Sequence, residues 1–395
     1  MHRRPRIAIA SSGLGHVARG IEAWAQDLAE ALAARGEDVL LLQGAGEPSV
    51  AFAQVVQCWP RESPQARRVL KALPRWLGWR LGLGSGYGVE QATFAWNLLW
   101  LLRREQIDIL HVQDPYVALW VERASRQGLV RARTILAHGT EESPEFLHEF
   151  RYVQHLAPWH LEEARAAGVW KPTWTAIGNF IDTQRFSPGR DDALRRELQI
   201  PPEALVIATS AAIKRHHKRI DYLLREFAAL VQRRPDLPLY LVVAGGRESD
   251  TDELVAEGNR LLGQRVRFLV RFPRARMSGL YRAADVLVLA SLKEMMPIAL
   301  LEATASGLAC VVNDHPVLRW MTGPGALAAD LSREGALAEQ LERLAADAEL
   351  RVRLGALARA HCEMNFSREA VVDRIVAYYQ SVLTPEAPAV LAAET

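Results

Sequence analysis

Apolar, strand-like runs alternate with helical stretches along nearly all of the 395 residues. A first series contains RIAIA (6–10), a helical stretch (16–36), DVLLLQG (38–44), IDILHV (107–112), RTILAHG (133–139) and WTAIG (174–178). A second series contains ALVIATS (204–210), a helix (218–233), LPLYLVVAGG (237–246), RVRFLV (265–270), ADVLVLAS (284–291) and LACVVND (308–314). Strands that alternate with helices predict βα units, in which helices cover both faces of a parallel sheet.

The chain is long enough for two domains. A polar segment with proline and glycine, Thr183 to Glu203, separates the two series. We therefore predict an α/β protein of two Rossmann-like, doubly wound domains that face a cleft, comprising residues 1–180 and 181–370. Residues 371–395 are expected to form a helix that packs back toward the N-terminal domain, followed by a frayed tail. Ligands of such sheets bind beyond the carboxyl ends of the strands.

Composition excludes several classes of protein. A net charge of +2 argues against a general nucleic-acid binder, which needs a large basic excess. Three widely spaced cysteines favour neither a disulfide framework nor a cysteine metal site, so a cytoplasmic location is expected. The basic N-terminus leads into a strand rather than a signal peptide, and no apolar run reaches the roughly 20 residues of a membrane span.

The loop SSGLGHVARG follows the first predicted strand and opens a helix. Gly13 and Gly15 would let the backbone approach a ligand closely, and the helix N-terminus favours anionic groups. A dinucleotide-binding loop would have other glycine spacing and an acid after the next strand, which ends here in LLQG. A tight turn without a ligand is the alternative interpretation.

Dense positive charge follows the first strand of the second series, in IKRHHKRIDYLL. Lys218, with Lys214 or Arg215, could hold a diphosphate there. Arg219 is expected to be solvated. The adjacent His216 and His217 do not predict a metal site, because neighbouring residues seldom converge on one ion.

Two further candidates follow strands of the first series. Within RTILAHG, His138 and Gly139 stand directly after the predicted strand, where a ring nitrogen of His138 at the cleft edge could serve the reaction or simply pack. Asp114 precedes Pro115, a pattern typical of a helix cap.

The stretch KEMMPIALLEATASG holds two glutamates around a proline. On one helix, Glu294 and Glu302 would lie roughly 80° apart, which suits a shared face poorly. Pro297 suits the first turn of a helix, so Glu294 is expected on a loop and Glu302 within the helix. Backbone amides after Pro297, beginning at Ile298, could face a phosphate.

Together these motifs resemble the retaining glycosyltransferases of family 4, which have the GT-B fold. The signature is EMMPIALLEATASGLACVV, supported by the Gly-rich first loop, AHG, AIGNFIDTQRFSP, HKRIDYL, VVAGG and LYRAADVLVLAS. The order and spacing of these motifs along nearly the whole chain carry the resemblance. It implies an acceptor-binding N-terminal domain and a nucleotide-sugar-binding C-terminal domain.

The resemblance also implies residue roles. Glu294, His138 and Lys218 would be catalytic: Glu294 would contact the hydroxyls of the donor sugar, His138 would lie beside that sugar, and Lys218 would hold the diphosphate. Glu302 would bind the nucleotide ribose. The remaining donor-binding candidates are Gly13, Gly15, Lys214, Arg215, Gly245, Pro297 and Ile298, and the acceptor candidates are His16 and Asp114.

Two positions depart from the family pattern. The arginine usually found five residues before the clamp lysine is replaced by Ile213, so Lys214 or Arg215 would supply the second cation. Met295 and Met296 stand where small glycines are common, and they either narrow the sugar pocket or fill core.

The predicted reaction, in glycan or glycolipid synthesis, is the transfer of a hexosyl group from a nucleotide-diphosphate sugar to a hydroxyl acceptor. The acceptor is a sugar or a lipid-linked acceptor, and the transfer proceeds with retention and without a divalent metal or other cofactor. A non-catalytic nucleotide-sugar-binding protein is one alternative. A glycoside hydrolase that uses Glu294 and Glu302 across one bond is another.

The segment from Trp59 to Gly86 mixes six basic residues and one acid with Trp76, Trp79 and leucines. Such a composition suits the headgroup level of an anionic membrane. Peripheral membrane contact through residues 59–86 is one prediction, and an ordinary solvated helix is the other.

Overall fold

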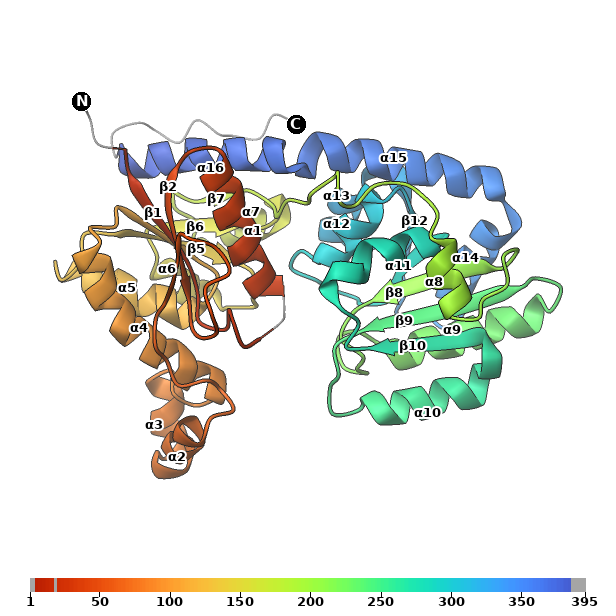
Figure 1. Ribbon diagram of the computed structural model, residues 1–395, viewed down its shortest axis with the longest axis horizontal. Helices are drawn as coiled ribbons and strands as arrows, with labels where there is room; N and C mark the ends of the chain where they lie inside the picture. Colours follow the sequence, from red (N-terminus) through yellow and green to blue (C-terminus); the bar gives the residue numbers. More distant parts are fainter. Residues whose placement is uncertain (1–3, 18–19, 385–395) are drawn as a thin grey trace. The chain divides into compact units, whose positions relative to one another are not determined.

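A computed structural model describes residues 4–17 and 20–384 (Figure 1). It contains two compact units. The first comprises Met1–Gly178 with Val372–Thr395, and the second comprises Asn179–Val371.

The first unit is built on a seven-stranded parallel sheet with the order β3-β2-β1-β4-β5-β6-β7. Its elements are β1 (Arg6–Ser11), α1 (Gly20–Ala34), β2 (Asp38–Gln43), β3 (Ala53–Val55), α2 (Pro64–Ala72), α3 (Arg75–Arg80), α4 (Gly86–Arg104), β4 (Ile109–Val112), α5 (Pro115–Arg126), β5 (Arg133–His138), α6 (Pro144–His148), β6 (Tyr152–His155), α7 (Pro158–Ala166) and β7 (Thr175–Ala176). Figure 1 shows α2 and α3 beyond one end of this sheet.

The second unit has a six-stranded parallel sheet with the order β10-β9-β8-β11-β12-β13. Its elements are α8 (Asp192–Glu197), β8 (Leu205–Ser210), α9 (Ile220–Arg233), β9 (Leu239–Gly245), α10 (Thr251–Leu262), η1 (Gly263–Arg265), β10 (Val266–Val270), η2 (Arg274–Arg276), α11 (Met277–Ala283), β11 (Val286–Leu289), α12 (Ile298–Ala305), β12 (Ala309–Asn313), α13 (Pro316–Thr322), η3 (Gly323–Gly325), β13 (Ala326–Ala329), α14 (Ala336–Ala346) and α15 (Ala348–Phe366).

The apolar pattern explains both cores. β11 reads VLVL and is buried along its whole length, as expected for a strand covered on both faces. α9 buries Ile220, Leu223, Phe227 and Leu230, whose spacing of three and four residues forms one face of a helix. The prediction of two doubly wound parallel sheets is confirmed.

Three strands, β3, β6 and β13, were not predicted from the sequence. β6 reads YVQH and buries a glutamine and a histidine, so it lacks an apolar run. β3 has three half-buried residues, and the ALAA of β13 favours a helix by composition. Pairing within the sheet, rather than local preference, makes these segments strands.

The last described helix, α16 (Arg368–Leu383), carries the chain into the first unit from Val372 onward. Tyr378 donates a hydrogen bond to the carbonyl oxygen of Thr173 at 2.7 Å, and the Tyr379 hydroxyl lies 2.7 Å from Nδ1 of His111. The tail predicted at the C-terminal end of 371–395 lies, from residue 385 on, outside the described residues.

Candidate active site

In each sheet the strand order reverses at one point, between β1 and β4 in the first unit and between β8 and β11 in the second. Loops that leave two neighbouring strands in opposite directions open a crevice there, which is where ligands of open α/β sheets bind. The candidates that follow β1 and β4 in the first unit, and β8 and β11 in the second, lie at these reversal points, whereas His138 ends β5 and Gly245 ends β9.

In the second unit, the loops after β8 and β11 bring Lys218 and Glu294 together. The Lys218 ammonium forms an ion pair with Oε1 of Glu294, and Glu294 is only 7% exposed. His217 Nε2 lies 2.9 Å from the carbonyl oxygen of Lys293 and 3.7 Å from Oε2 of Glu294. The structure therefore holds a cation and a carboxylate side by side at the end of the sheet.

Glu302 lies in α12, the helix that follows the loop of Glu294. α12 begins at Ile298 with Pro297 as its N-cap, so Glu294 is on the loop and Glu302 is in the helix, as predicted. The buried Tyr281 hydroxyl donates a hydrogen bond to Oε2 of Glu302 at 2.7 Å. Burial and the nearby Glu302 charge raise the pKa of Tyr281 well above its ordinary value, so the phenol stays protonated and orients the carboxylate.

Sequence analysis missed Tyr281, although it stands within the quoted LYRAADV motif. A tyrosine on the buried face of a helix needs a hydrogen-bond partner for its hydroxyl. That requirement was the available signal.

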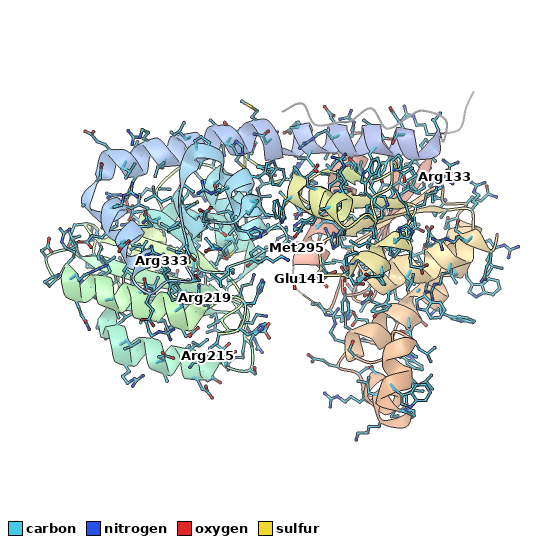
Figure 2. All side chains as sticks on the ribbon, turned by 180° about the vertical axis from the view of Figure 1, so that it is seen from behind. Arg133, Glu141, Arg215, Arg219, Met295 and Arg333 are labelled. Carbon is cyan, nitrogen blue, oxygen red and sulfur yellow. The ribbon has the colours of Figure 1, made fainter. Side chains whose placement is uncertain are left out.

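The remaining cations of the loop after β8 have different partners. Arg215 pairs with Glu257 at 2.9 Å and with Glu253 at 3.9 Å, both on α10, and its amide donates to Asp250. Figure 2 shows Arg215 on the side of α10. Among the described residues, the Lys214 side chain has no ion-pair partner, so Lys214 is the better second cation.

The prediction that Arg219 is solvated is wrong. Its guanidinium donates to the carbonyl oxygens of Ala290 at 3.3 Å and Leu331 at 2.7 Å, and it lies 3.9 Å from the ring centroid of Tyr222. Arg219 also precedes α9 in the left-handed conformation, with φ 51°. It therefore anchors the loops after β11 and β13.

Two other candidates of the second unit serve packing. A Cβ on Gly245 would lie 1.7 Å from the carbonyl oxygen of Ala211, so the backbone itself requires glycine there. Met296 is buried, and its sulfur accepts a hydrogen bond from the amide of Asn179 at 2.9 Å. Of the two interpretations for the methionines, core filling describes Met296.

In the first unit, the glycines of the loop after β1 also have close neighbours. Gly15 has φ 95°, and a Cβ there would lie 1.8 Å from the carbonyl oxygen of Ala45. A Cβ on Gly13 would lie 2.2 Å from Oε1 of Glu22. The backbone contact and the positive φ require glycine at position 15 whether or not a ligand approaches, whereas the neighbour of Gly13 is the end of a side chain.

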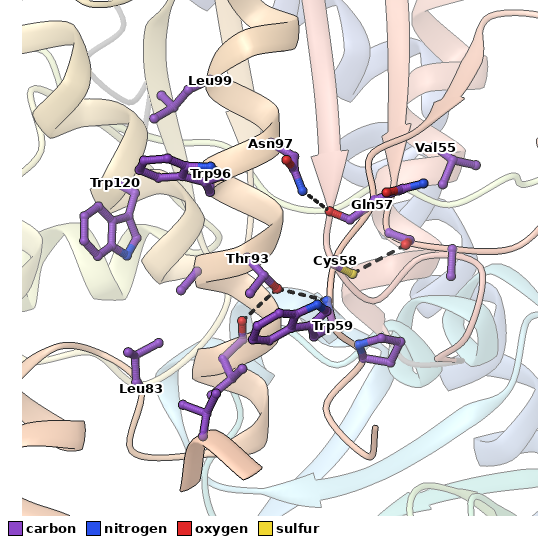
Figure 3. A pocket seen from close by; sticks show the side chains of 16 residues that line it. Val55, Gln57, Cys58, Trp59, Leu83, Thr93, Trp96, Asn97, Leu99 and Trp120 are labelled. Carbon is purple, nitrogen blue, oxygen red and sulfur yellow. Dashed lines mark hydrogen bonds between the residues drawn. The ribbon is translucent and has the colours of Figure 1, made fainter. Parts of the chain in front are cut away.

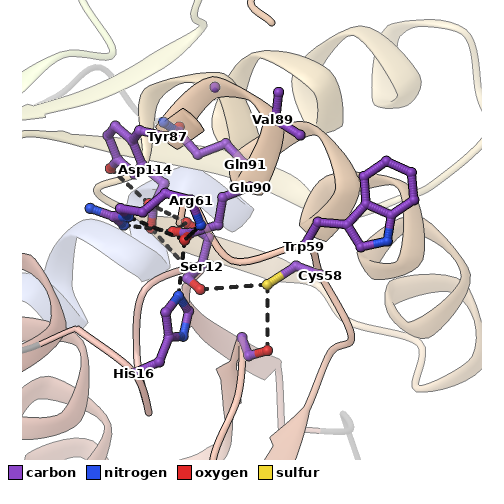
Figure 4. A network of polar contacts seen from close by, with 12 residues as sticks. Ser12, His16, Cys58, Trp59, Arg61, Tyr87, Val89, Glu90, Gln91 and Asp114 are labelled. Carbon is purple, nitrogen blue, oxygen red and sulfur yellow. Dashed lines mark hydrogen bonds and ion pairs between the residues drawn. The ribbon is translucent and has the colours of Figure 1, made fainter. Parts of the chain in front are cut away.

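A polar network surrounds Glu90 of α4, which is completely buried (Figure 4). Arg61 donates to its carboxylate from Nε at 3.1 Å and from Nη2 at 2.5 Å. His16 Nε2 lies 2.9 Å from Oε2, and the Ser12 hydroxyl donates to Oε1 at 3.3 Å. Burial opposes ionisation, but the hydrogen bonds from His16 and Arg61 outweigh it and lower the pKa of Glu90 to about 2.

Asp114 belongs to the same network. It is the N-cap of α5, as predicted, yet its side chain makes no capping hydrogen bond. It accepts instead from the Ser12 amide at 3.1 Å, the Ser12 hydroxyl at 2.8 Å and the Tyr87 hydroxyl at 2.8 Å. Asp114 is fully buried, and burial raises its pKa. The capping role expected of its side chain is therefore wrong.

The sequence did not predict three of these residues as part of a site: Arg61, Tyr87 and Glu90. A lone acid in the apolar stretch GYGVEQATFAW was the signal, because a carboxylate on a buried helix face needs a partner. The partner, Arg61, comes from a loop 29 residues earlier, which the sequence does not connect to it.

His138 ends β5 and is 6% exposed. Its Nδ1 lies 3.1 Å from Nδ1 of His155, its ring centroid is 5.9 Å from that of His160, and its Nε2 is 3.8 Å from Oε2 of Glu142. Burial, followed by the neighbouring His138 and His160, lowers the pKa of His155 well below its ordinary value. His138 thus belongs to a histidine cluster that sequence analysis did not foresee, because β6 was missed.

The part of the chain that the structure describes contains no group of three or more His, Cys, Asp or Glu side chains arranged to hold a metal ion. Cys58, Cys310 and Cys362 are free thiols. None of the described helices combines the length and apolar composition that a membrane-spanning segment needs.

Comparisons with known proteins agree on a class. Residues 18–222 match the model of Glycosyltransferase Family 4, and residues 190–361 match that of Glycosyl transferases group 1. Over 158 residues the chain is 36% identical to D-inositol 3-phosphate glycosyltransferase of Corynebacterium jeikeium, a match that covers 38% of this chain and 36% of that protein. The chain thus spans about a third of the length of the curated relatives it matches.

Solved structures share the fold. Sucrose-phosphate synthase from Thermosynechococcus elongatus aligns with a TM-score of 0.76 at 20% identity, over 97% of this chain and 100% of that one. Anabaena Alr3699/HepE in complex with UDP and glucose aligns with a TM-score of 0.72 at 16% identity, over 96% and 100%. Because the family 4 model covers more than half of the chain, and two Rossmann-like units of parallel strands are present, this protein is a glycosyltransferase of family 4 with the GT-B fold.

Proposed function

We propose that this glycosyltransferase moves a hexosyl group from a nucleotide-diphosphate sugar to a hydroxyl acceptor, with retention at the anomeric carbon. The observation that carries the proposal is the Lys218–Glu294 pair at the reversal point of the second unit. A buried carboxylate held by one ammonium is poised for a change of partners, because an incoming diphosphate can take the lysine and sugar hydroxyls can take the glutamate.

Each part of the donor has a matching group in this unit. Lys218, with Lys214 as second cation, would balance the charge of the diphosphate. The amides at the start of α12, from Ile298, would face the phosphates, because a helix N-terminus favours anions. Glu302, oriented by Tyr281, would accept hydrogen bonds from the ribose.

In the reaction, the bond between the anomeric carbon and the diphosphate oxygen breaks, and a bond to the acceptor oxygen forms on the same face of the sugar. The departing phosphate accepts the proton of the acceptor hydroxyl. The residues of this chain bind and orient the donor and stabilise the leaving charge, and no metal or other cofactor is part of the proposal. Structures of Anabaena Alr3699/HepE hold UDP and UDP-glucose, and the shared fold supports a nucleotide-sugar donor here by analogy.

The proposal includes a cytoplasmic location and leaves the acceptor either soluble or lipid-linked. His16, Asp114 and the Glu90 network of the first unit are its acceptor-side candidates, and His138 is the candidate beside the transferring sugar. Because the Asp114 and Glu90 carboxylates are buried and already hydrogen-bonded, they would shape the acceptor site through Ser12 and His16.

The test is nucleotide binding and turnover in Lys218→Ala. UDP, GDP and ADP are titrated calorimetrically, and release of the diphosphate is followed with the matching nucleotide-sugars. Loss of one preorganised cation is expected to lower turnover by roughly a hundredfold to a thousandfold.

Arg225→Ala is the matched control, because Arg225 is an exposed arginine on α9 that pairs only locally with Asp221 at 3.0 Å. Equal losses in the two variants would mean a general charge effect, and no loss in either would remove Lys218 from the site.

A further inference from the structure

An apolar groove runs along α4 of the first unit. Its main cavity has a volume of about 670 Å³ (Figure 3). The residues that line it are mostly apolar and include three tryptophans, Trp59, Trp96 and Trp120. Specific small-molecule sites have this size and this kind of lining.

The groove is longer than one cavity. A second cavity of about 490 Å³ shares Val55, Gln57 and Asn97 with the first and continues to Trp100 and Arg104. From Val89 to Arg104 the helix advances about 22 Å, at 1.5 Å per residue. The result is an elongated groove between α4 and the segment that follows β2, apolar along the first cavity and of mixed polarity along the second.

Its aromatic walls remain in contact with solvent. Trp96 and Trp100 are each 69% exposed, and Trp59 and Trp120 are 44% and 40% exposed. Trp96 and Trp100 stand four residues apart and therefore lie on one face of α4. Large apolar side chains that gather around a hollow, rather than scatter singly, indicate a binding surface.

One end of the groove meets the polar network of the first unit. Its lining residues Pro60 and Val89 directly precede Arg61 and Glu90 in the chain, and Cys58 Sγ lies 3.9 Å from the carbonyl oxygen of Ser12. Figure 4 shows Cys58, Trp59 and Val89 beside that network. A ligand that fills both places must have a polar end and an apolar tail.

Charge around the groove indicates which amphiphile fits. Val69 of α2 lines it, and three basic residues of that helix are exposed: Arg68 next to Val69, and Arg67 and Lys71 on the face away from Val69. The first turn of α2 contains no acid. An anionic head group would be attracted to this helix, whereas a cationic one would be repelled.

We infer that the groove along α4 binds the hydrocarbon chain of an anionic lipid that carries the acceptor hydroxyl, an inference that rests on the hydroxyl-acceptor transfer proposed above. The chain lies between Trp59, Trp96 and Trp120, and the phosphate of the lipid lies near α2. The acceptor group then reaches the polar network around Glu90. The groove thereby selects the acceptor by its tail.

The first experiment measures how affinity depends on chain length. The full-length protein is titrated calorimetrically with inorganic phosphate and with butyl, hexyl, octyl and decyl phosphate below their micelle concentrations. Burial of each methylene is worth up to about a fourfold gain in affinity, so each two-carbon step is expected to tighten binding by up to about 16-fold until the groove is filled. Decyl trimethylammonium, with the same tail and opposite charge, is expected to bind more weakly than decyl phosphate.

Variants test whether the hydrocarbon tail binds in the groove. Ala92→Trp, which fills the cavity, and Trp96→Ser, which removes one wall, are expected to flatten the chain-length dependence. Trp170→Ser is the matched control, because Trp170 is 40% exposed in the same unit and lines neither cavity. Thermal unfolding verifies that each variant is folded, and the strong exposure of Trp96 makes its loss easy to tolerate.

Three results would overturn the inference: affinity independent of chain length, an equal effect of Trp170→Ser, or a dimer in sedimentation that Trp96→Ser dissociates, since a second copy would then cover the groove. UDP binding with its Lys218 dependence is measured on the same samples. If the groove fails while UDP binding persists, the proposed donor site stands, and the reverse result removes the proposed function while leaving tail binding intact.

Discussion

Glu294 and Glu302 are held by partners of different charge, an ammonium in one case and a phenol in the other. A carboxylate paired with a cation keeps its charge and can exchange that cation for a ligand. A carboxylate held by a neutral hydroxyl keeps its orientation. The two acids therefore have different surroundings, and the predictions for them differ accordingly.

We expect Glu294→Ala to lower kcat strongly with little change in the apparent Kd of the donor. Glu302→Ala and Tyr281→Phe should instead weaken donor binding, because they remove or misorient a contact shared by ground and transition states. Loss of one hydrogen bond to a charged group predicts roughly a tenfold to hundredfold weaker Kd for Glu302→Ala.

Steady-state kinetics together with direct donor titration separate the two effects. Glu302→Gln, which can still accept from Tyr281, should retain more affinity than Glu302→Ala. Wild-type kcat and Kd in both alanine variants would refute the assignment.

A pH effect on stability belongs to Glu90. Its folded pKa, about 2, lies below its ordinary value of 4.5, so its ionised form stabilises the fold above about pH 4.5, and this contribution is lost as the pH falls toward about 2. The shift corresponds to on the order of 3 kcal/mol. Denaturant unfolding at several pH values should show a smaller loss of stability on acidification in Glu90→Gln than in wild type. Parallel pH profiles for the two proteins would contradict this expectation.

Among the elements, the start of α9 shows how a loop is fixed. Arg219 occupies a left-handed position, and its side chain reaches two carbonyl oxygens in loops after β11 and β13. The loop that carries Glu294 therefore depends on a residue from the neighbouring strand's loop. The sequence predicted a solvated arginine, but in the folded unit its side chain links two loops.

Arg219→Ala is accordingly expected to lower the free energy of unfolding by about 1–3 kcal/mol, because buried carbonyl oxygens lose their donor. Arg225→Ala, in the same helix, should change it by less than about 0.5 kcal/mol. Urea denaturation of both variants provides the measurement, and an unchanged midpoint for Arg219→Ala would show that its contacts contribute nothing.

The helix α2 carries the prediction of membrane contact. Arg61 is withdrawn into the Glu90 network, which leaves Arg67, Arg68 and Lys71 exposed, with Trp76 of α3 67% exposed. Each basic residue near an anionic surface contributes roughly 1 kcal/mol. We expect co-sedimentation with phosphatidylserine vesicles at low salt, weakened by Arg67→Glu with Arg68→Glu.

Arg260→Glu with Arg353→Glu gives the same change in net charge at exposed positions of the second unit and is the matched control. Sedimentation that is absent at low salt, or that both double variants reduce equally, would leave a soluble acceptor as the default.

At the scale of the whole molecule, the chain repeats one architecture in two units and returns to the first at Val372. Short-range patterns in the sequence were sufficient to predict most of this architecture. Buried parallel strands such as VLVL need long apolar runs, and Pro297 fixes where α12 begins, so strands, helices and the loop position of Glu294 could be predicted.

What the sequence by itself determined is what short-range chemistry controls: apolar periodicity, the helix boundary at Pro297 and the position of Lys218 and of Glu294 in loops that follow strands. Only the tertiary structure decided which polar groups become partners. Arg61 meets Glu90, Tyr281 meets Glu302, and Asp114 bonds to Ser12 rather than capping its helix. The physical reason is that a buried polar group must find a partner wherever the fold brings one within hydrogen-bond distance, and that distance depends on the packing of segments far apart in the chain.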